Sequence, residues 1–227
     1  MTSAPTSKQP VSSFSPFYGC AIIAMAVFVF VGIIAWSLYS LIQQDRAIAV
    51  FAQAQPAALP PLPSPQGDAA LQARLQRAVE QSGEGELILS VDDLNRLLRL
   101  APEGAYGSYR DMLRLLAFDP GRGVLVMQAS LPLNPLPLVG EGRRFLNGRV
   151  LYKPETPETG LDARVVGVEV PGHEVPEGFV GAMGTWTLLG PYREHPKVLG
   201  FLQRVGAVEV LPQGLRLSLR AAPAPGA

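Results

Sequence analysis

The sequence predicts an α+β protein: one N-terminal transmembrane helix, a proline-rich linker, and a domain of antiparallel hairpins packed with amphipathic helices. Three observations predict this class. A long uncharged apolar run lies near the N-terminus, five prolines fall within residues 56–66, and the remaining chain groups helical and alternating patterns without a regular β–α–β order. The expected divisions are a tail at 1–17, a transmembrane helix at 18–42, a helix extension and linker at 43–67, a domain at 68–221 and a tail at 222–227.

The apolar run covers Tyr18 to Ile42, twenty-five residues without a charged side chain. As an α-helix it would be about 37 Å long at about 1.5 Å per residue, and a bilayer core is about 30 Å thick. A cleaved secretory signal carries a shorter apolar stretch, of about 7 to 15 residues. A lipoprotein carries its lipidated cysteine after the apolar segment, whereas Cys20 lies at the start of this one. We therefore expect an uncleaved membrane anchor, with a buried core helix as the alternative.

The flanks of the span bear on its orientation. Residues 1–17 are rich in Ser, Thr and Pro, so they are expected to be a mobile tail that cannot bury enough apolar surface to fold. The positive-inside rule counts little more than Lys8 on one side and Arg46 on the other. A short segment before the span and a large polar one after it favour a single-pass anchor in the cell membrane with the C-terminal domain outside the cytoplasm.

The segment after the span is expected to be a spacer. The helix can continue beyond Ile42 by up to three turns, until Pro56 ends it. Residues 56–66 then favour an extended polyproline II backbone at about 3.1 Å per residue, which would hold the domain about 30 Å from the membrane end. A ligand for a proline-recognition domain is the alternative.

Two amphipathic helices are expected next. The first has Asp68 as its N-terminal cap and Gly83 at its end, with apolar residues at intervals of four: Leu71, Leu75 and Val79. The second runs from Ser90, its expected cap, to about Leu100, and Asp93 lies near the positive end of its dipole. Its apolar stripe is Val91, Leu94, Leu97 and Leu98, while Asp92, Arg96 and Arg99 are expected to face water.

Hairpin patterns dominate the rest of the chain. Expected strands are 86–89, 112–118, 124–130, 145–153, 161–170, 207–211 and 215–220. The connection Asp119–Gly123, with its Pro and Gly residues, suits an antiparallel turn. Residues 102–108 and 131–142 are expected to be irregular, 179–189 to form a short helix, and a further helix to follow His195–Pro196.

Composition and motifs exclude several kinds of function. Nineteen basic and nineteen acidic residues balance, which argues against the basic patch that nucleic-acid binding needs. The sequence has no phosphate loop, no H-E-x-x-H, no G-x-S-x-G, no paired C-x-x-C and no dinucleotide fingerprint after a strand. We therefore expect no catalytic residue, no bound metal and no cofactor. Trp186 is expected to be a core or membrane-edge aromatic.

The two histidines are the basis of the alternative, enzymatic function. His173 and His195 lie in different segments, where turn or capping roles are expected. Glu174, Glu177 and Glu194 would complete a general acid–base set if folding brought them close to a histidine. An envelope enzyme with a site assembled around His173 or His195 is therefore the alternative to a non-enzymatic protein.

The helix opening from Ser90 to Leu98, S-V-D-D-L-N-R-L-L, follows a single span and a spacer, and precedes hairpins, a late helix and a terminal hairpin. This layout resembles that of YpmS-like bacterial proteins, which are membrane-anchored and lie outside the cytoplasm. Related leucine–asparagine openings occur in lipid-binding domains with a tubular fold. The resemblance implies an envelope protein without catalytic residues that contacts lipid, although the short strands and residues 131–142 depart from a full lipid tube.

Three functional classes follow. The first is a non-enzymatic envelope protein that binds membrane lipid or another envelope component, or scaffolds a membrane complex with envelope protein partners. The second is the histidine-based enzyme, and the third is a subunit of a larger assembly that uses the span as its contact. An apolar groove in the structure would favour the first, a polar cleft around a histidine the second, and an exposed apolar patch the third.

Overall fold

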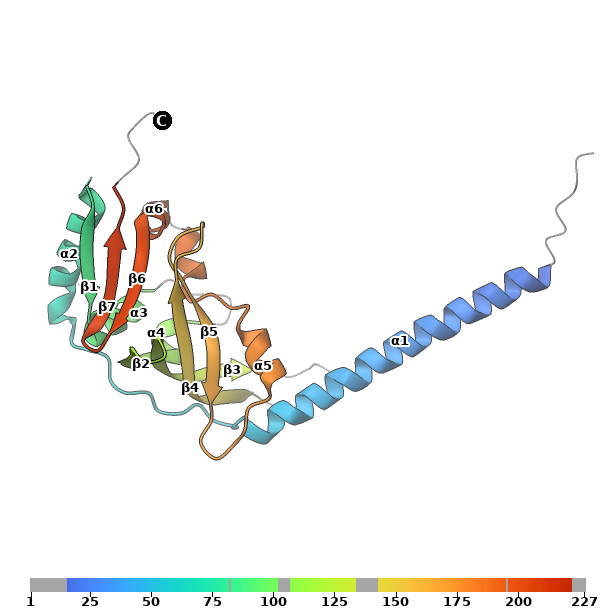
Figure 1. Ribbon diagram of the computed structural model, residues 1–227. Helices are drawn as coiled ribbons and strands as arrows, with labels where there is room; N and C mark the ends of the chain where they lie inside the picture. The colour runs from blue at the N-terminus through green and yellow to red at the C-terminus, as the bar shows by residue number, and fades with distance from the viewer. Residues whose placement is uncertain (1–15, 82, 102–106, 134–142, 195, 222–227) are drawn as a thin grey trace, which may run out of the picture. The chain divides into compact units, whose positions relative to one another are not determined.

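The computed structural model describes residues 16–81, 83–101, 107–133, 143–194 and 196–221 (Figure 1). Most of the two expected tails, and parts of the expected loops at 102–108 and 131–142, lie outside the described residues. The chain divides into two compact units, Met1–Arg46 and Ala47–Ala227. The described residues contain helices, 3-10 turns and antiparallel sheets, which confirms the α+β class.

The first unit is built from the long apolar helix. Helix α1 (Pro16–Phe51) has 36 residues, and the part that lies in this unit exposes large apolar side chains, among them Phe28 and Phe30. By length and composition it can cross a membrane. The helix extends beyond the expected span but ends at Phe51, earlier than Pro56, because Gln53 already pairs in β fashion with Phe145.

A four-stranded antiparallel sheet forms the middle of the second unit. Its order is β2-β3-β4-β5, so each strand pairs with its neighbour in sequence. The strands are β2 (Leu113–Asp119), β3 (Val124–Leu133), β4 (Arg144–Glu155) and β5 (Asp162–Glu169). The first two expected hairpins are therefore confirmed, and β2 carries a bulge between Leu115 and Ala117.

A second sheet joins distant parts of the chain. Its order is β1-β7-β6, formed by β1 (Gly85–Leu89), β6 (Val205–Leu211) and β7 (Gly214–Leu219). The hairpin β6–β7 is the one that the sequence predicts. Strand β1 pairs with β7 along its whole length, from Gly85↔Leu219 to Leu89↔Leu215, so the first strand of the unit closes on the last.

Short helices connect and cover the strands. They are η1 (Pro65–Gly67), α2 (Asp68–Glu80), α3 (Val91–Leu100), α4 (Tyr109–Met112), α5 (Glu177–Met183), η2 (Gly190–Glu194) and α6 (Pro196–Arg204). Helix α5 accounts only for the first part of the helix expected at 179–189; turns follow it, with one bridge between Thr187 and Arg164. A single apolar core runs through both sheets, with Leu146, Val150 and Leu217 almost fully buried.

The expected capping of α3 is confirmed. The N–H of Asp93 donates to Ser90 Oγ at 3.2 Å, and the N–H of Ser90 donates to the Asp93 carboxylate at 3.0 Å. Arg74 of α2 pairs with the same carboxylate at 3.1 Å. The Asp93 carboxylate therefore closes the first turn of α3 and ties it to α2.

The expectation for Asp68 is wrong. Helix α2 is capped by Gly67, without a side-chain hydrogen bond. The Asp68 carboxylate instead accepts from Arg96 at 3.2 Å and from Arg99, both on α3. Arg96 and Arg99 do not face water either, since their side chains are only 13% and 15% exposed. These two ion pairs join α2 to α3, which the sequence predicts as separate helices.

The linker also differs from the expectation of a spacer. Residues 53–67, called the strap below, lie against the second unit instead of standing free of it. The N–H of Ala57 donates to Asn147 Oδ1 at 3.0 Å and to Ser130 Oγ at 3.1 Å, while Asn147 Nδ2 donates to the Gln55 carbonyl at 2.8 Å. Arg114 Nε donates to the Pro60 carbonyl at 2.8 Å.

The course of the strap follows from the strand register. Ser130 on β3 pairs with Asn147 on β4, and Gln128 on β3 pairs with Arg114 on β2. The strap therefore crosses β4, β3 and β2 in that order and then reaches α3, where Arg99 donates to the Pro63 carbonyl at 2.9 Å. Figure 1 shows this segment running along one side of the domain to α2. An extended proline-rich backbone makes no internal hydrogen bonds, so its carbonyls are free to accept from the domain.

Candidate functional site

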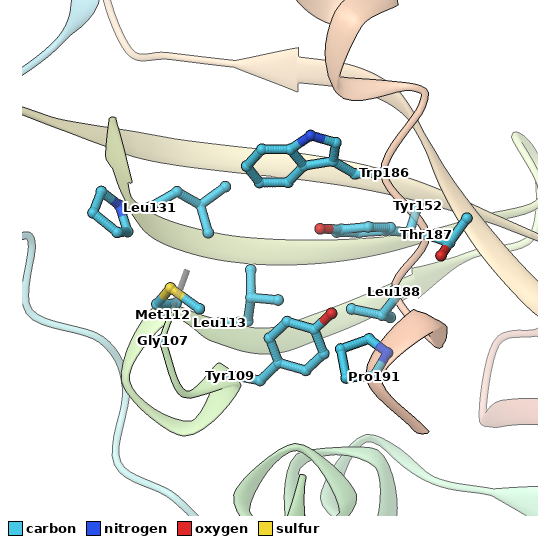
Figure 2. A pocket seen from close by; sticks show the side chains of 11 residues that line it. Gly107, Tyr109, Met112, Leu113, Leu131, Tyr152, Trp186, Thr187, Leu188 and Pro191 are labelled. Carbon is cyan, nitrogen blue, oxygen red and sulfur yellow. The ribbon is translucent and has the colours of Figure 1, made fainter. Parts of the chain in front are cut away.

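An apolar pocket of about 200 Å³ lies where α4, the four-stranded sheet and the segment after α5 meet (Figure 2). Its lining consists of Gly107, Tyr109, Met112, Leu113, Leu131, Pro132, Tyr152, Trp186, Thr187, Leu188 and Pro191. Ten of these are apolar or aromatic in most of their surface, and Thr187 adds a hydroxyl. The pocket is a concave, mostly apolar site with a few polar groups, as is typical of ligand sites.

One wall comes from α4, a single helical turn before β2. Gly107 precedes it with φ of +120°, a backbone angle that favours glycine because it has no Cβ. The N–H of Leu113 donates to the Tyr109 carbonyl, which closes the turn directly into the strand. Residues three apart in a helix lie on one face, so Tyr109 and Met112 both line the pocket.

Tyr152 of β4 forms the centre of the pocket. It pairs with Leu125 on one side and Val165 on the other, and a bulge lies between Leu151 and Tyr152. Its side chain is 4% exposed, and Figure 2 shows its hydroxyl directed into the pocket below the indole of Trp186. At the bulge β4 does not alternate, since Val150, Leu151 and Tyr152 are all buried, and a phenol therefore enters the core at this point.

The opposite wall is the segment that follows α5. The N–H of Trp186 donates to the Met183 carbonyl at 2.9 Å, and the N–H of Leu188 donates to the Ala163 carbonyl at 3.0 Å. These bonds hold Trp186 against the pocket with 36% of its surface exposed. Trp186 is thus a partly exposed pocket residue, which differs from the core or membrane-edge position expected for it.

Burial keeps the tyrosine hydroxyls of this region neutral. Burial and the nearby negative charge of Asp162 raise the pKa of Tyr109 to about 12. Burial, with a smaller effect of Tyr109, also raises the pKa of Tyr152 and of Tyr192. At neutral pH all three hydroxyls are protonated, so they can donate a hydrogen bond.

Asp162 lies behind Tyr109 and is held in a fixed arrangement. It is almost fully buried, and its carboxylate pairs with Arg193 at 3.1 Å and accepts from the N–H of Ala163 at 2.8 Å. Arg193 also donates to the Leu161 carbonyl at 3.1 Å. This ion pair joins β5 to η2. Asp162 neutralises the positive charge of Arg193, a cation on this side of the pocket.

A second hollow of about 380 Å³ is open and lined by both polar and apolar residues near the β2–β3 turn. Three of its four charged lining residues pair with one another: Arg122 contacts Asp119 at 2.7 Å and Glu169 at 3.4 Å. Exposed ion pairs of this kind are common surface features. The apolar pocket is therefore the better candidate site.

In the described part of the chain, no hydrogen bond or ion pair joins the His173 side chain to Glu174, Glu177 or Glu194. His173 lies in a turn after β5, exposed, with its N–H donating to the Val170 carbonyl at 3.1 Å. His195 lies outside the described residues. Glu174, Glu177 and Glu194 are exposed and do not line the pocket. Among the residues that the structure describes, no group of three or more His, Cys, Asp or Glu side chains is placed to hold a metal ion.

The pocket residues were not found from the sequence. Tyr109, Tyr152 and Trp186 are far apart in the chain, and each lies within a pattern that also suits an ordinary loop or strand. The available signal was that Trp186 is the only tryptophan outside the span. Comparisons with protein-family models, with curated proteins and with solved structures found no match for this chain.

Proposed function

We propose that this chain is a non-enzymatic, membrane-anchored envelope protein whose domain takes up an apolar part of a lipid or of another envelope component. The observation that carries the proposal is the aromatic-lined pocket of about 200 Å³ in a domain that follows an exposed apolar helix. Single-pass insertion through α1, with the domain outside the cytoplasm, belongs to the same proposal.

The size of the pocket restricts what it binds. Sites for whole drug-sized molecules measure about 300–1,000 Å³. At roughly the 30 Å³ that one water-sized group occupies in a liquid, the pocket holds about seven non-hydrogen atoms. The proposed occupant is therefore one segment of an apolar chain, and the rest of the molecule stays outside the pocket.

The chain offers a direct test, because Trp36 and Trp186 are its two tryptophans. Trp36→Phe leaves Trp186, in the pocket lining, as the sole tryptophan, whose emission can be excited selectively beyond the tyrosine absorption. The full chain, held in an amphipathic polymer, is titrated with hexane. We expect the Trp186 emission to shift and saturate, because hexane displaces water from beside the indole.

A matched pair of variants controls this test. Leu131→Phe enlarges a lining residue and should abolish the response, whereas Val166→Phe adds the same ring at an exposed position outside the lining. Both variants should keep the thermal midpoint of the parent within a few degrees. A linear, non-saturating response, or an equal response in both variants, would refute the proposal.

The enzymatic alternative is tested separately. His173→Ala removes an exposed imidazole whose residue contributes a turn hydrogen bond only through its backbone. On the proposed function the variant binds hexane as the parent does and reaches the same cellular abundance. Loss of the cellular role with unchanged abundance would favour an enzyme, because a destabilised protein loses both together.

A further inference from the structure

The hydroxyl of Tyr152 is the polar feature that the apolar character of the pocket leaves unexplained. The side chain is 4% exposed, and its hydroxyl makes no hydrogen bond with any residue that the structure describes. The Tyr152 hydroxyl oxygen keeps some accessible surface, so a molecule in the pocket can reach it. A buried hydroxyl without a partner is unfavourable, and such groups usually have one.

A second hydroxyl lies close by. Figure 2 shows the Tyr109 hydroxyl pointing into the space toward which the Tyr152 hydroxyl also points, and both rings line it. Tyr109 lies near enough to Tyr152 to add to the effect of burial, which raises the pKa of Tyr152. The pocket therefore presents two protonated donors together with apolar side chains such as those of Leu131 and Met112.

The charges around the pocket favour a neutral hydrogen-bond acceptor over an anion as the partner of these two hydroxyls. Among the lining residues that the structure describes, none is an arginine, a lysine or a histidine. Arg193, two residues after the lining residue Pro191, is paired with Asp162, whose negative charge already acts on Tyr109. An anion placed here would be desolvated without a counter-ion, which costs far more than burying a neutral acceptor.

We propose, on the basis of the function proposed above, that the pocket recognises an ester-linked acyl chain: Tyr152 and Tyr109 donate to the ester carbonyl, and the lining around them holds the carbon atoms that follow it. An ester carbonyl is a neutral acceptor that has no hydrogen to leave unpaired among apolar side chains. The exposed apolar helix α1 makes a lipid ester the source that the chain would meet.

The test compares three probes on the full chain in an amphipathic polymer, with Trp36→Phe as background and Trp186 emission as readout. The probes are methyl hexanoate, hexanoate and hexane. We expect methyl hexanoate to bind more tightly than hexane, and hexanoate at neutral pH to bind more weakly than the ester. Tyr152→Phe should weaken methyl hexanoate binding about 3- to 10-fold, the value of one hydrogen bond, and leave hexane binding unchanged or slightly tighter.

Tyr39→Phe, on α1, is the matched control and should change none of the three affinities. Thermal midpoints of all variants establish that they are folded. If hexane and methyl hexanoate bind equally and Tyr152→Phe affects both alike, the ester assignment is overturned while the apolar binding function stands. Tighter binding of hexanoate than of the ester also overturns it. If no probe gives a saturable response, the proposed function itself fails.

Discussion

The side-chain amide of Asn95 forms two hydrogen bonds with the backbone of Leu115: Nδ2 donates to the carbonyl at 3.0 Å, and Oδ1 accepts from the N–H at 2.9 Å. Leu115 lies on β2, an edge strand, beside the bulge that separates it from Ala117. Asn95 is buried on α3. The Asn95 amide thus satisfies both backbone groups of Leu115, as a neighbouring strand would, and holds α3 against the edge of the sheet.

Replacing Asn95 should therefore be costly. Asn95→Ala leaves a buried N–H and a buried carbonyl of Leu115 without partners, and we expect a loss of about 2–4 kcal/mol in unfolding free energy. Asp92→Ala, at an exposed position of the same helix, should stay within about 0.5 kcal/mol. Thermal or urea unfolding followed by Trp186 emission measures both. Equal effects would mean that the amide pair contributes little.

The strap should be part of the folded domain. A fragment of residues 68–221 lacks the carbonyl of Pro60, so the guanidinium of Arg114, a residue that is only 9% exposed, loses an acceptor. We expect a fragment of residues 47–221 to be more stable than that of residues 68–221 by about 3 kcal/mol or more, since hydrogen bonds to charged groups contribute about 1.5–3 kcal/mol each.

The same contact can be tested in the longer fragment. Arg114→Ala should lower its unfolding free energy, whereas Arg149→Ala, at an exposed position on β4, should not. Urea midpoints of the four proteins give the comparison. Identical midpoints for the two fragments would return the strap to the role of a free spacer.

The apolar stripe of α3 provides a prediction with an internal control. Leu98 is 5% exposed and belongs to the core, whereas Leu100, two residues later, is 48% exposed. Leu98→Ala should destabilise the domain by about 2–5 kcal/mol, and Leu100→Ala by less than about 1 kcal/mol. Comparable losses in the two variants would show that α3 is not held by this face.

The buried tyrosines predict alkaline instability. The pKa of Tyr109 is raised to about 12 from the 10 of an unfolded chain. Because the folded pKa is the higher one, the folded state binds more protons in this interval, so this contribution to stability is complete below about pH 10 and is lost as the pH rises through about 12.

We therefore expect the unfolding free energy to fall between about pH 10 and pH 12 and the fall to be smaller in Tyr109→Phe. Tyrosinate absorbance measured alongside unfolding identifies the groups that titrate. A pH profile that is the same in the parent and the variant would contradict the assignment to Tyr109.

The sequence by itself determined the features that depend on nearby residues. The uncharged run predicts a long apolar helix whatever follows it. The capping box of Ser90 and Asp93 spans four residues, and the turn at Asp119–Gly123 joins adjacent strands, so the first helix turn and the hairpins follow from local chemistry. Each of these needs only a few residues of one segment to agree with one another.

Only the tertiary structure decided how distant segments complete one another's polar and apolar groups. Arg96 and Arg99 have the spacing of a water-facing helix side, yet they bind Asp68 and the strap, because the strap brings unpaired carbonyls to them. Likewise Tyr152 has the pattern of an ordinary strand residue, and it lines a pocket because α4 and Trp186 are packed around it. Hydrogen-bond partners and cavities are shared between segments, so no single stretch of sequence specifies them.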